Sequence, residues 1–281
     1  KTLLVVPMII AMLVATIRKL RQTSGIAYGH WWIPGGVVAV LAARCTRRSS
    51  IVHLHGSDVT VAQIPMMRKV AQLVLRAADE RLAVSEALAE WGRGLSDRGV
   101  HVLPMPLMFD RLPSPSPVPT HGVVLAVGRL VTEKGFDVLI DAMAHLEPEQ
   151  RSELVVVGVG PDRQVLAQRA ADAGVALHLP GAVAPTELAD WYRRARIVAV
   201  PSRREGFGLV AAEAAAAGRA VVGSAVGGIP VVVKSGVSGV LVEPGDVEAL
   251  AAALKTVDPE WGANGPGLVS HLDATTHGRF V

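Results

Sequence analysis

Short apolar runs alternate with longer segments of helical periodicity along most of the chain. Strands and helices of an α/β protein produce this alternation, because buried parallel strands are apolar throughout while helices carry one apolar face. In the first half, apolar runs predict strands at residues 51–55 and 81–84. Helices are predicted there at residues 59–77 and 85–93.

The second half shows the same alternation more clearly. Apolar runs predict strands at residues 123–127, 154–157, 176–179, 197–200 and 220–222. Helix-length segments lie between them at residues 136–146, 162–173 and 186–195. Strands and helices in this order predict doubly wound parallel sheets, so the expected fold class is α/β.

A proline-rich segment separates the two halves. It reads DRLPSPSPVPT at residues 110–120, with proline at every second position from 113 to 119. Proline disfavours helix and sheet alike and stiffens an extended spacer, so we predict a linker between two Rossmann-like domains with a cleft between them. The expected boundaries are 1–112 for the first domain, 113–121 for the linker, 122–255 for the second domain and 256–281 for a C-terminal tail. Within the tail, WGANGPG is typical of a loop.

The N-terminal segment is apolar from residue 3 to residue 17 and is followed by Arg18, Lys19 and Arg21. It spans about 15 residues, whereas a membrane-crossing helix needs roughly 20. We expect a buried or interfacial helix whose basic end is either solvated or in peripheral contact with anionic lipid. Because the chain starts on lysine, we also expect it to be a fragment.

Composition narrows the class of protein further. Of the 281 residues, 50% are hydrophobic and only 4% aromatic, which favours α/β over a β-sandwich. The formal net charge of +3 is spread along the chain, so no nucleic-acid partner is expected. The single cysteine, Cys45, excludes an internal disulfide and a cysteine-rich zinc site. It favours a reducing, cytoplasmic compartment, and we expect it to pack within a helix.

The stretch VPSRREGFGLVAAEAAAA at residues 200–217 carries the most chemistry. A strand end is followed by a loop with Glu205 and then by a helix with Glu213. Gly206 and Gly208 allow the backbone to approach a ligand, and the helix start offers unpaired N–H groups to phosphate or a polar sugar. Two carboxylates facing one cavity would suit a ligand rich in hydroxyl groups, such as a sugar nucleotide.

Several segments between residues 30 and 246 together resemble the retaining glycosyltransferases of family 4, which have the two-domain GT-B fold. They are HWWIPGG, HGSD, VGRLVTEKGFDVLIDAM, VVVGVGP, PSRREGFGLVAAEAAAAG, VGGIP and SGVLVEPGD. The resemblance implies transfer of a sugar from a nucleoside diphosphate sugar to an acceptor hydroxyl, with retained anomeric configuration. It implies no cofactor and no metal, and the acceptor can be a lipid, a saccharide or a small molecule. The family's glycine-rich loop after the first strand and its closing C-terminal helix are not found, so the first domain is expected to be incomplete.

The resemblance also assigns roles to charged residues. Arg129 and Lys134 grip the diphosphate and stabilise its departure, although they can also be an exposed pair at a helix start. Glu205 hydrogen-bonds hydroxyls of the transferred sugar, unless it is a solvated loop carboxylate. Glu213 binds the ribose, unless it forms a salt bridge to Arg203 or Arg204. His55 lies beside the donor sugar, unless it caps or packs locally.

Backbone positions complete the implied donor site: Gly128, Gly181, Val183, Gly206, Phe207, Gly208, Leu209 and Gly227. In the first domain, Asp58 is interpreted as a helix cap in preference to a catalytic base. His30, Trp31 and Trp32 line the acceptor side or serve as packing.

Other classes stay open at this point. A nucleotide-sugar epimerase or a phosphorylase can use the same two domains, and an inactive nucleotide-sugar-binding fragment is a third class. A dehydrogenase is disfavoured, because VGVGPD at 157–162 is one glycine short of the dinucleotide fingerprint. We expect a cytoplasmic protein, with peripheral contact at the inner face of the membrane as an option.

Overall fold

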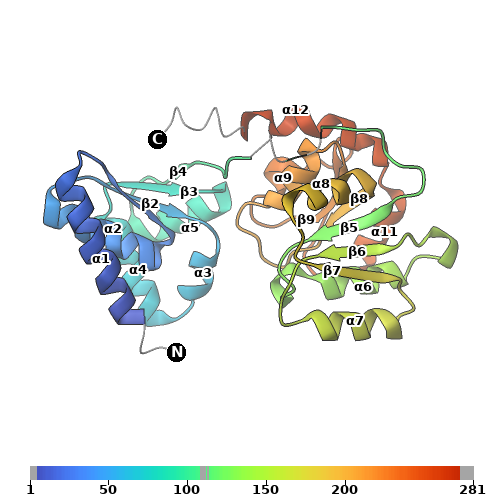
Figure 1. The fold of residues 1–281 in the computed structure, drawn as a ribbon, viewed down its shortest axis with the longest axis horizontal. Helices are drawn as coiled ribbons and strands as arrows, with labels where there is room; N and C mark the ends of the chain where they lie inside the picture. Colours follow the sequence, from blue (N-terminus) through green and yellow to red (C-terminus); the bar gives the residue numbers. More distant parts are fainter. Residues whose placement is uncertain (1–4, 108–111, 113, 273–281) are drawn as a thin grey trace. The chain divides into compact units, whose positions relative to one another are not determined.

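The computed structural model describes residues 5–107, 112 and 114–272, and the chain divides into two compact units, Lys1–Pro104 and Met105–Val281 (Figure 1). The division falls before the proline-rich segment, so the expected linker belongs to the second unit. Of that linker, Pro113 lies outside the described residues. Both units are α/β with parallel sheets, which confirms the predicted fold class.

The first unit contains a four-stranded parallel sheet in the order β1-β2-β3-β4. Its strands are β1 (Ala27–His30), β2 (Ser50–Leu54), β3 (Glu80–Ala83) and β4 (His101–Val102). Its helices are α1 (Val5–Gln22), α2 (Val37–Thr46), α3 (Ser57–Val61), α4 (Pro65–Ala77) and α5 (Glu86–Ser96). The single helix expected at 59–77 was wrong: Pro65 opens α4 and Ile64 before it is extended, because the proline ring disfavours a helical residue ahead of it.

Helix α1 packs on α2 through one face only. Leu20 is buried, with Leu13 and Ile17 packed against the same small cluster, whereas Val6 and Ile10 are exposed. Among the described residues, no helix is long and apolar enough to cross a membrane. The packing role expected for Cys45 was wrong, because this residue is exposed at the end of α2.

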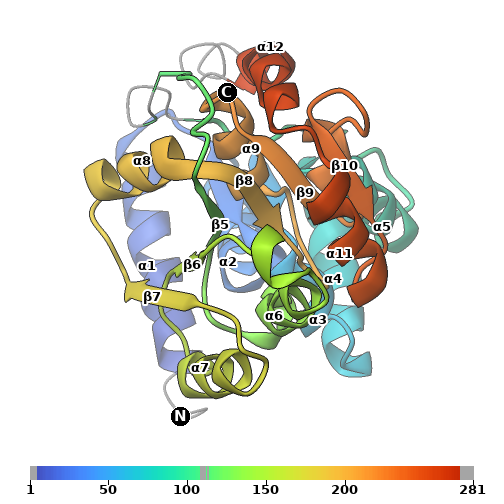
Figure 2. The ribbon, with the colours of Figure 1, turned by 90° about the vertical axis from the view of Figure 1, so that its right-hand side faces the viewer.

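The second unit contains a six-stranded sheet in the order β10-β9-β8-β5-β6-β7, and every strand pair is parallel. Its strands are β5 (Val123–Val127), β6 (Leu154–Val157), β7 (Leu177–Gly181), β8 (Ala195–Val200), β9 (Ala220–Ser224) and β10 (Gly239–Val242). The helices are α6 (Phe136–Ala144), α7 (Arg163–Asp172), α8 (Pro185–Arg194), α9 (Leu209–Ala216), α10 (Ile229–Val232), α11 (Val247–Thr256) and α12 (Gly265–Val269). Helices α6, α7 and α11 cover one face of this sheet, while α8, α9 and α12 cover the other (Figure 2).

The strand order places a topological switch point between β5 and β8. The chain runs from β5 outward through β6 to β7, then crosses back and runs outward through β8 and β9 to β10. The connections after β5 and β8 therefore leave the sheet side by side at its carboxyl edge. Open α/β sheets bind ligands at such a point.

The proline-rich segment and the C-terminal tail are part of the second unit's packing. Arg219, which is buried, donates hydrogen bonds to the Ser116 carbonyl (2.7 Å) and hydroxyl (2.6 Å), so this part of the expected linker is fixed to the second unit. The loop expected at WGANGPG was wrong, because Pro259–Asn264 and α12 are helical. Gly265 explains the close packing of α12 on α9: a Cβ there would lie 2.5 Å from the Ala215 carbonyl oxygen.

Candidate functional site

Lys134 and Glu205 meet at the switch point of the second sheet. Lys134 follows β5 and Glu205 follows β8, and the Lys134 ammonium donates a 2.7 Å hydrogen bond to Oε2 of Glu205. Both side chains are mostly shielded from solvent, with 22% and 15% exposed. The Ser202 hydroxyl (3.3 Å) and the Gly206 amide (3.1 Å) donate further hydrogen bonds to the same carboxylate. The Lys134 ammonium and the Glu205 carboxylate, which accepts three hydrogen bonds, are thus held together at the place where open α/β sheets bind ligands.

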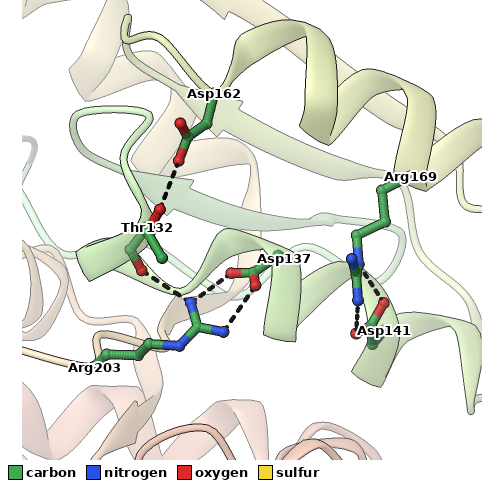
Figure 3. A network of polar contacts seen from close by, with 6 residues as sticks. All are labelled: Thr132, Asp137, Asp141, Asp162, Arg169 and Arg203. Carbon is green, nitrogen blue, oxygen red and sulfur yellow. Dashed lines mark hydrogen bonds and ion pairs between the residues drawn. The ribbon is translucent and has the colours of Figure 1, made fainter.

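The two segments that carry this pair are bound to each other. The Arg203 amide donates to the Glu133 carbonyl oxygen at 2.9 Å, and the Arg203 guanidinium holds the Asp137 carboxylate with two 2.7 Å hydrogen bonds (Figure 3). Arg203 also donates to the carbonyl oxygen of Thr132. Burial raises the pKa of Asp137, but the hydrogen bonds and charge of Arg203, together with backbone hydrogen bonds, lower it on balance. Arg203 therefore fixes the Glu205 loop against the start of α6.

Two glycines allow a further loop to press on the Glu205 loop. Gly227 has φ +61°, and a Cβ there would lie 2.0 Å from the Glu205 carbonyl oxygen. Gly208 has φ +89° at the N-cap of α9, where a Cβ would lie 2.8 Å from the Ile229 side chain. A side chain at either position would push these loops apart, so both glycines are needed for the close loop packing at the carboxyl edge of the sheet.

Glu213 is paired with a tyrosine and not with an arginine. The hydroxyl of Tyr192, on α8, donates a 2.8 Å hydrogen bond to Oε2 of Glu213. The alternative of a salt bridge to Arg203 or Arg204 was wrong, because these arginines pair with Asp137 and Glu133. Burial raises the pKa of Glu213, and the hydrogen bond from Tyr192 opposes this rise only in part.

The Glu213 carboxylate lines a cavity of about 340 Å³ within the second unit. Tyr192, Leu209 and Val183 also line it, and most of the remaining wall is apolar. Among the described residues, the lining includes Glu213 but not Glu205, so the two carboxylates do not face one cavity as expected. An apolar cavity with one carboxylate can take a flat ring together with a hydroxyl-bearing group.

The other residues of the expected donor site lie around this edge. Gly128 directly follows the last residue of β5, and the exposed Arg129 comes next. A Cβ on Gly128 would approach the aliphatic chain of Lys134 at 3.6 Å. Phe207, two residues after Glu205, is buried. Gly181 is the last residue of β7. Lys134 is thus in direct contact with the Glu205 carboxylate, whereas Arg129 is exposed in the same connection after β5.

In the first unit, His55 lies at the carboxyl end of β2 beside His30, which ends β1. Nδ1 of His30 and Nε2 of His55 share a hydrogen bond of 2.8 Å. The exposed Trp31 packs on His55 with its ring centroid 5.2 Å away, and its φ of +59° is unusual for a bulky residue. Burial, with the neighbouring His53 and His30, lowers the pKa of His55 to about 3. His55 is therefore a neutral hydrogen-bonding group at physiological pH.

Asp58 joins the two histidine segments. Its carboxylate accepts hydrogen bonds from the backbone amides of Trp32 (2.8 Å) and His55 (2.6 Å). It lies inside the first turn of α3, whose N-cap is Gly56, so the expected helix-cap role was wrong. Trp32 is fully buried and its indole N–H donates to the Asp58 carbonyl, which makes it a packing residue. His30 and Trp31, by contrast, are exposed.

The sequence did not point to Tyr192, His53 or Tyr28. Tyr192 lies on α8, where the spacing of apolar residues shows only which side of the helix is buried. Nothing in the neighbouring sequence predicts its contact with Glu213. His53 lies two residues before His55, and side chains at this spacing in an extended segment point the same way, which was a usable signal.

Comparisons with known proteins identify the family to which the chain belongs. Residues 112–257 match the family of glycosyl transferases group 1. A D-inositol 3-phosphate glycosyltransferase from Actinosynnema mirum is 34% identical over 292 aligned positions, which cover 90% of this chain and 68% of that protein. The chain belongs to the glycosyl transferases group 1 family.

Other relatives match over a shorter part. A D-inositol 3-phosphate glycosyltransferase from Thermobispora bispora is 41% identical over 164 residues, 53% of this chain and 38% of that protein. A solved structure of Anabaena Alr3699/HepE in complex with UDP and glucose superposes with a TM-score of 0.82 at 22% identity, covering 95% of this chain and 79% of that one. Sucrose-phosphate synthase from Thermosynechococcus elongatus gives 0.77 at 26% identity, covering 90% and 71%. These neighbours support the two Rossmann-like domains of a GT-B fold.

Proposed function

We propose that this chain is a family 4 glycosyltransferase that moves a sugar from a nucleoside diphosphate sugar to an acceptor hydroxyl with retained anomeric configuration. The observation that carries the proposal is the meeting of Lys134 and Glu205 at the switch point between β5 and β8. Lys134 and the exposed Arg129 supply positive charge for a diphosphate. Glu205 supplies a carboxylate for sugar hydroxyls.

The nucleoside end fits the cavity lined by Glu213. Val183 and Leu209 offer apolar surface to a base, while the Glu213 carboxylate accepts hydrogen bonds from ribose hydroxyls. The amides of Phe207, Gly208 and Leu209 at the start of α9 are the donors we assign to the diphosphate and sugar. The structural neighbour bound to UDP makes a uridine diphosphate sugar the first donor to test.

The retaining step needs no protein nucleophile in this proposal. The leaving diphosphate takes the acceptor proton on the same face of the sugar, while Arg129 and Lys134 stabilise the charge that develops on it. His55, which is neutral and hydrogen-bonded to His30, is the first-unit residue that we assign to the donor sugar. Two basic residues replace a divalent ion at the diphosphate, so turnover is expected to persist in EDTA.

The acceptor remains a lipid, a saccharide or a small molecule. The names of the relatives make D-inositol 3-phosphate the first acceptor to test. A cytoplasmic location, with the basic end of α1 against anionic lipid, is part of the proposal and is tested by vesicle co-sedimentation.

Calorimetry tests the donor site. UDP-, GDP- and ADP-sugars are titrated into the chain and into its Arg129→Ala and Glu213→Ala variants, with Lys255→Ala as a control on an exposed lysine. Each site variant is expected to weaken binding about 10- to 100-fold, as loss of a charged hydrogen bond does. Unchanged donor affinity in both Arg129→Ala and Glu213→Ala would overturn the assignment of these residues to the donor site. A product assay separates the rivals, because an altered free sugar nucleotide without a new glycoside indicates an epimerase.

A further inference from the structure

Three histidines of the first unit form a cluster at the carboxyl edge of its sheet. His53 lies on β2 and His55 directly follows its last residue, and their ring centroids lie 4.5 Å apart. His30 on β1 is the register partner of His53 across the parallel strand pair. Strand register therefore brings His30 and His53 together, and the ring of His55 contacts both of them. Each offers one ring nitrogen, and the three nitrogens lie within 4.8 Å of one another.

The ring of His53 is oriented as the ring of a metal ligand is. Its Nε2 lies 3.1 Å from the Leu103 carbonyl oxygen, which can only accept, so Nε2 carries the proton and Nδ1 has the lone pair. A backbone carbonyl that receives the second ring N–H is the usual outer contact of a ligating histidine. The Tyr28 hydroxyl donates to Nδ1 at 2.7 Å and has to turn aside for an ion.

The surroundings leave one side of the cluster open. His53 is buried, His55 is half-buried and His30 is exposed, so an ion can enter past His30 and keep a water molecule as a further ligand. The nearby Asp58 carboxylate is occupied by backbone amides and does not add a charged oxygen ligand. A site made only of imidazole nitrogens suits Zn²⁺ and its neighbours, whereas Mg²⁺ and Ca²⁺ require oxygen ligands.

We propose that His30, His53 and His55 bind one divalent transition-metal ion of the zinc class. All three proposed ligands belong to the first unit, whereas the residues proposed for the diphosphate, Arg129 and Lys134, belong to the second. Binding itself does not depend on the proposed function. One consequence does rest on it: an ion that engages His55 removes this residue from the donor sugar, so Zn²⁺ is expected to inhibit transfer and a chelator to restore it.

The test titrates Co²⁺ into the tag-free, chelator-treated 281-residue chain without donor or acceptor, followed by displacement with Zn²⁺. Visible bands of low-coordinate Co²⁺ should saturate at one ion per chain. His30→Ala and His55→Ala should each weaken binding by more than the roughly tenfold that loss of an outer contact costs. His101→Ala, an exposed histidine of the same sheet outside the cluster, should leave binding unchanged.

His30 is exposed, so His30→Ala should fold like the wild-type chain, and a change in its metal affinity can be assigned to the lost imidazole. No saturable band in the wild-type chain, or equal affinity in His30→Ala and wild type, would overturn the proposal. Because no sugar nucleotide is present, failure of this experiment leaves the glycosyltransferase proposal standing, and the reverse also holds.

Discussion

The ammonium of Lys134 lies 2.7 Å from the carboxylate of Glu205, although 71 residues separate them in the chain. The contact joins the connection after β5 to the connection after β8, the two segments that leave the sheet at its switch point. Lys134 therefore has an anionic partner within the chain. A diphosphate that binds here has to compete with Glu205 for the same ammonium.

This competition predicts opposite effects of Glu205→Gln on product binding and on turnover. With the carboxylate gone, Lys134 is released, and UDP should bind roughly two- to fivefold more tightly, the range expected for a weak, partly exposed ion pair. Turnover should fall about 10- to 100-fold, because sugar hydroxyls lose a charged acceptor. Calorimetry with UDP and a steady-state assay measure the two effects. Parallel losses in both would contradict the competition.

The Arg203–Asp137 contact should support catalysis without touching substrate. Its two hydrogen bonds hold the Glu205 loop against α6, but the side chains are 34% and 31% exposed. A double-mutant cycle of Arg203→Lys and Asp137→Asn should give a coupling energy of about 0.5–1 kcal/mol in unfolding. Each variant should also lower kcat, since Glu205 loses its fixed position.

The Arg169–Asp141 pair supplies a matched control for that cycle. It is another two-bond arginine–carboxylate contact, between α7 and α6, and is drawn beside the first in Figure 3. Asp141→Asn should lower stability by a similar amount and leave kcat unchanged. Equal kcat losses in Asp137→Asn and Asp141→Asn would show that the effect is general destabilisation.

The strand ends of the site were predictable from the sequence. Continuous apolar runs at β5 and β8 marked where each strand stops, and parallel strands present their carboxyl ends on one edge. That β5 and β8 are neighbours, which brings Lys134 to Glu205, is a matter of strand order and was not predicted. Gly227 could be singled out as a turn residue. Its actual constraint, a carbonyl 2.0 Å from where Cβ would lie, depends on packing between two loops.

Contacts between distant elements were not predictable. The Tyr192–Glu213 hydrogen bond joins two helices, and both residues belong to amphipathic or alanine-rich patterns that show only which face is buried. The proline-rich segment was interpreted as a stiff, extended spacer because local rules describe only the backbone conformations that proline allows. Its fixed position comes from Arg219, more than a hundred residues away, whose burial no local pattern reveals.

Gly227→Ala should disturb the Glu205 loop more than its backbone strain alone would. The residue has φ +61°, which costs a side-chain-bearing residue on the order of 1 kcal/mol, and the added Cβ also meets the Glu205 carbonyl. Gly245→Ala separates the two causes, because Gly245 has φ +85° and nothing within 4 Å of its Cβ position. Chemical unfolding should show a larger loss for Gly227→Ala, and only this variant should lower donor affinity. Equal losses would mean that the loop yields to the methyl group.

Glu213→Gln is expected to stabilise the ligand-free protein while weakening donor binding. Burial raises the pKa of Glu213 above its ordinary value of 4.5, so the neutral carboxyl is favoured in the folded state. The resulting stabilisation is fully present below the unfolded pKa and is lost as pH rises through the raised folded pKa. The wild-type chain therefore loses stability over this pH range, whereas glutamine, which still accepts the Tyr192 hydrogen bond, does not titrate.

Thermal unfolding from pH 4 to pH 8 measures this difference. The melting temperature of Glu213→Gln should exceed that of the wild type at pH 8, and the gap should narrow toward pH 4. Glu149→Gln, on an exposed glutamate of the same unit, should follow the wild-type curve. Donor affinity at pH 8 should fall about 10- to 100-fold in Glu213→Gln, because the ribose hydroxyls lose their charged acceptor. Parallel pH–stability curves would mean that the carboxylate is better solvated than its place beside Tyr192 implies, and the ribose role would then lose its electrostatic basis.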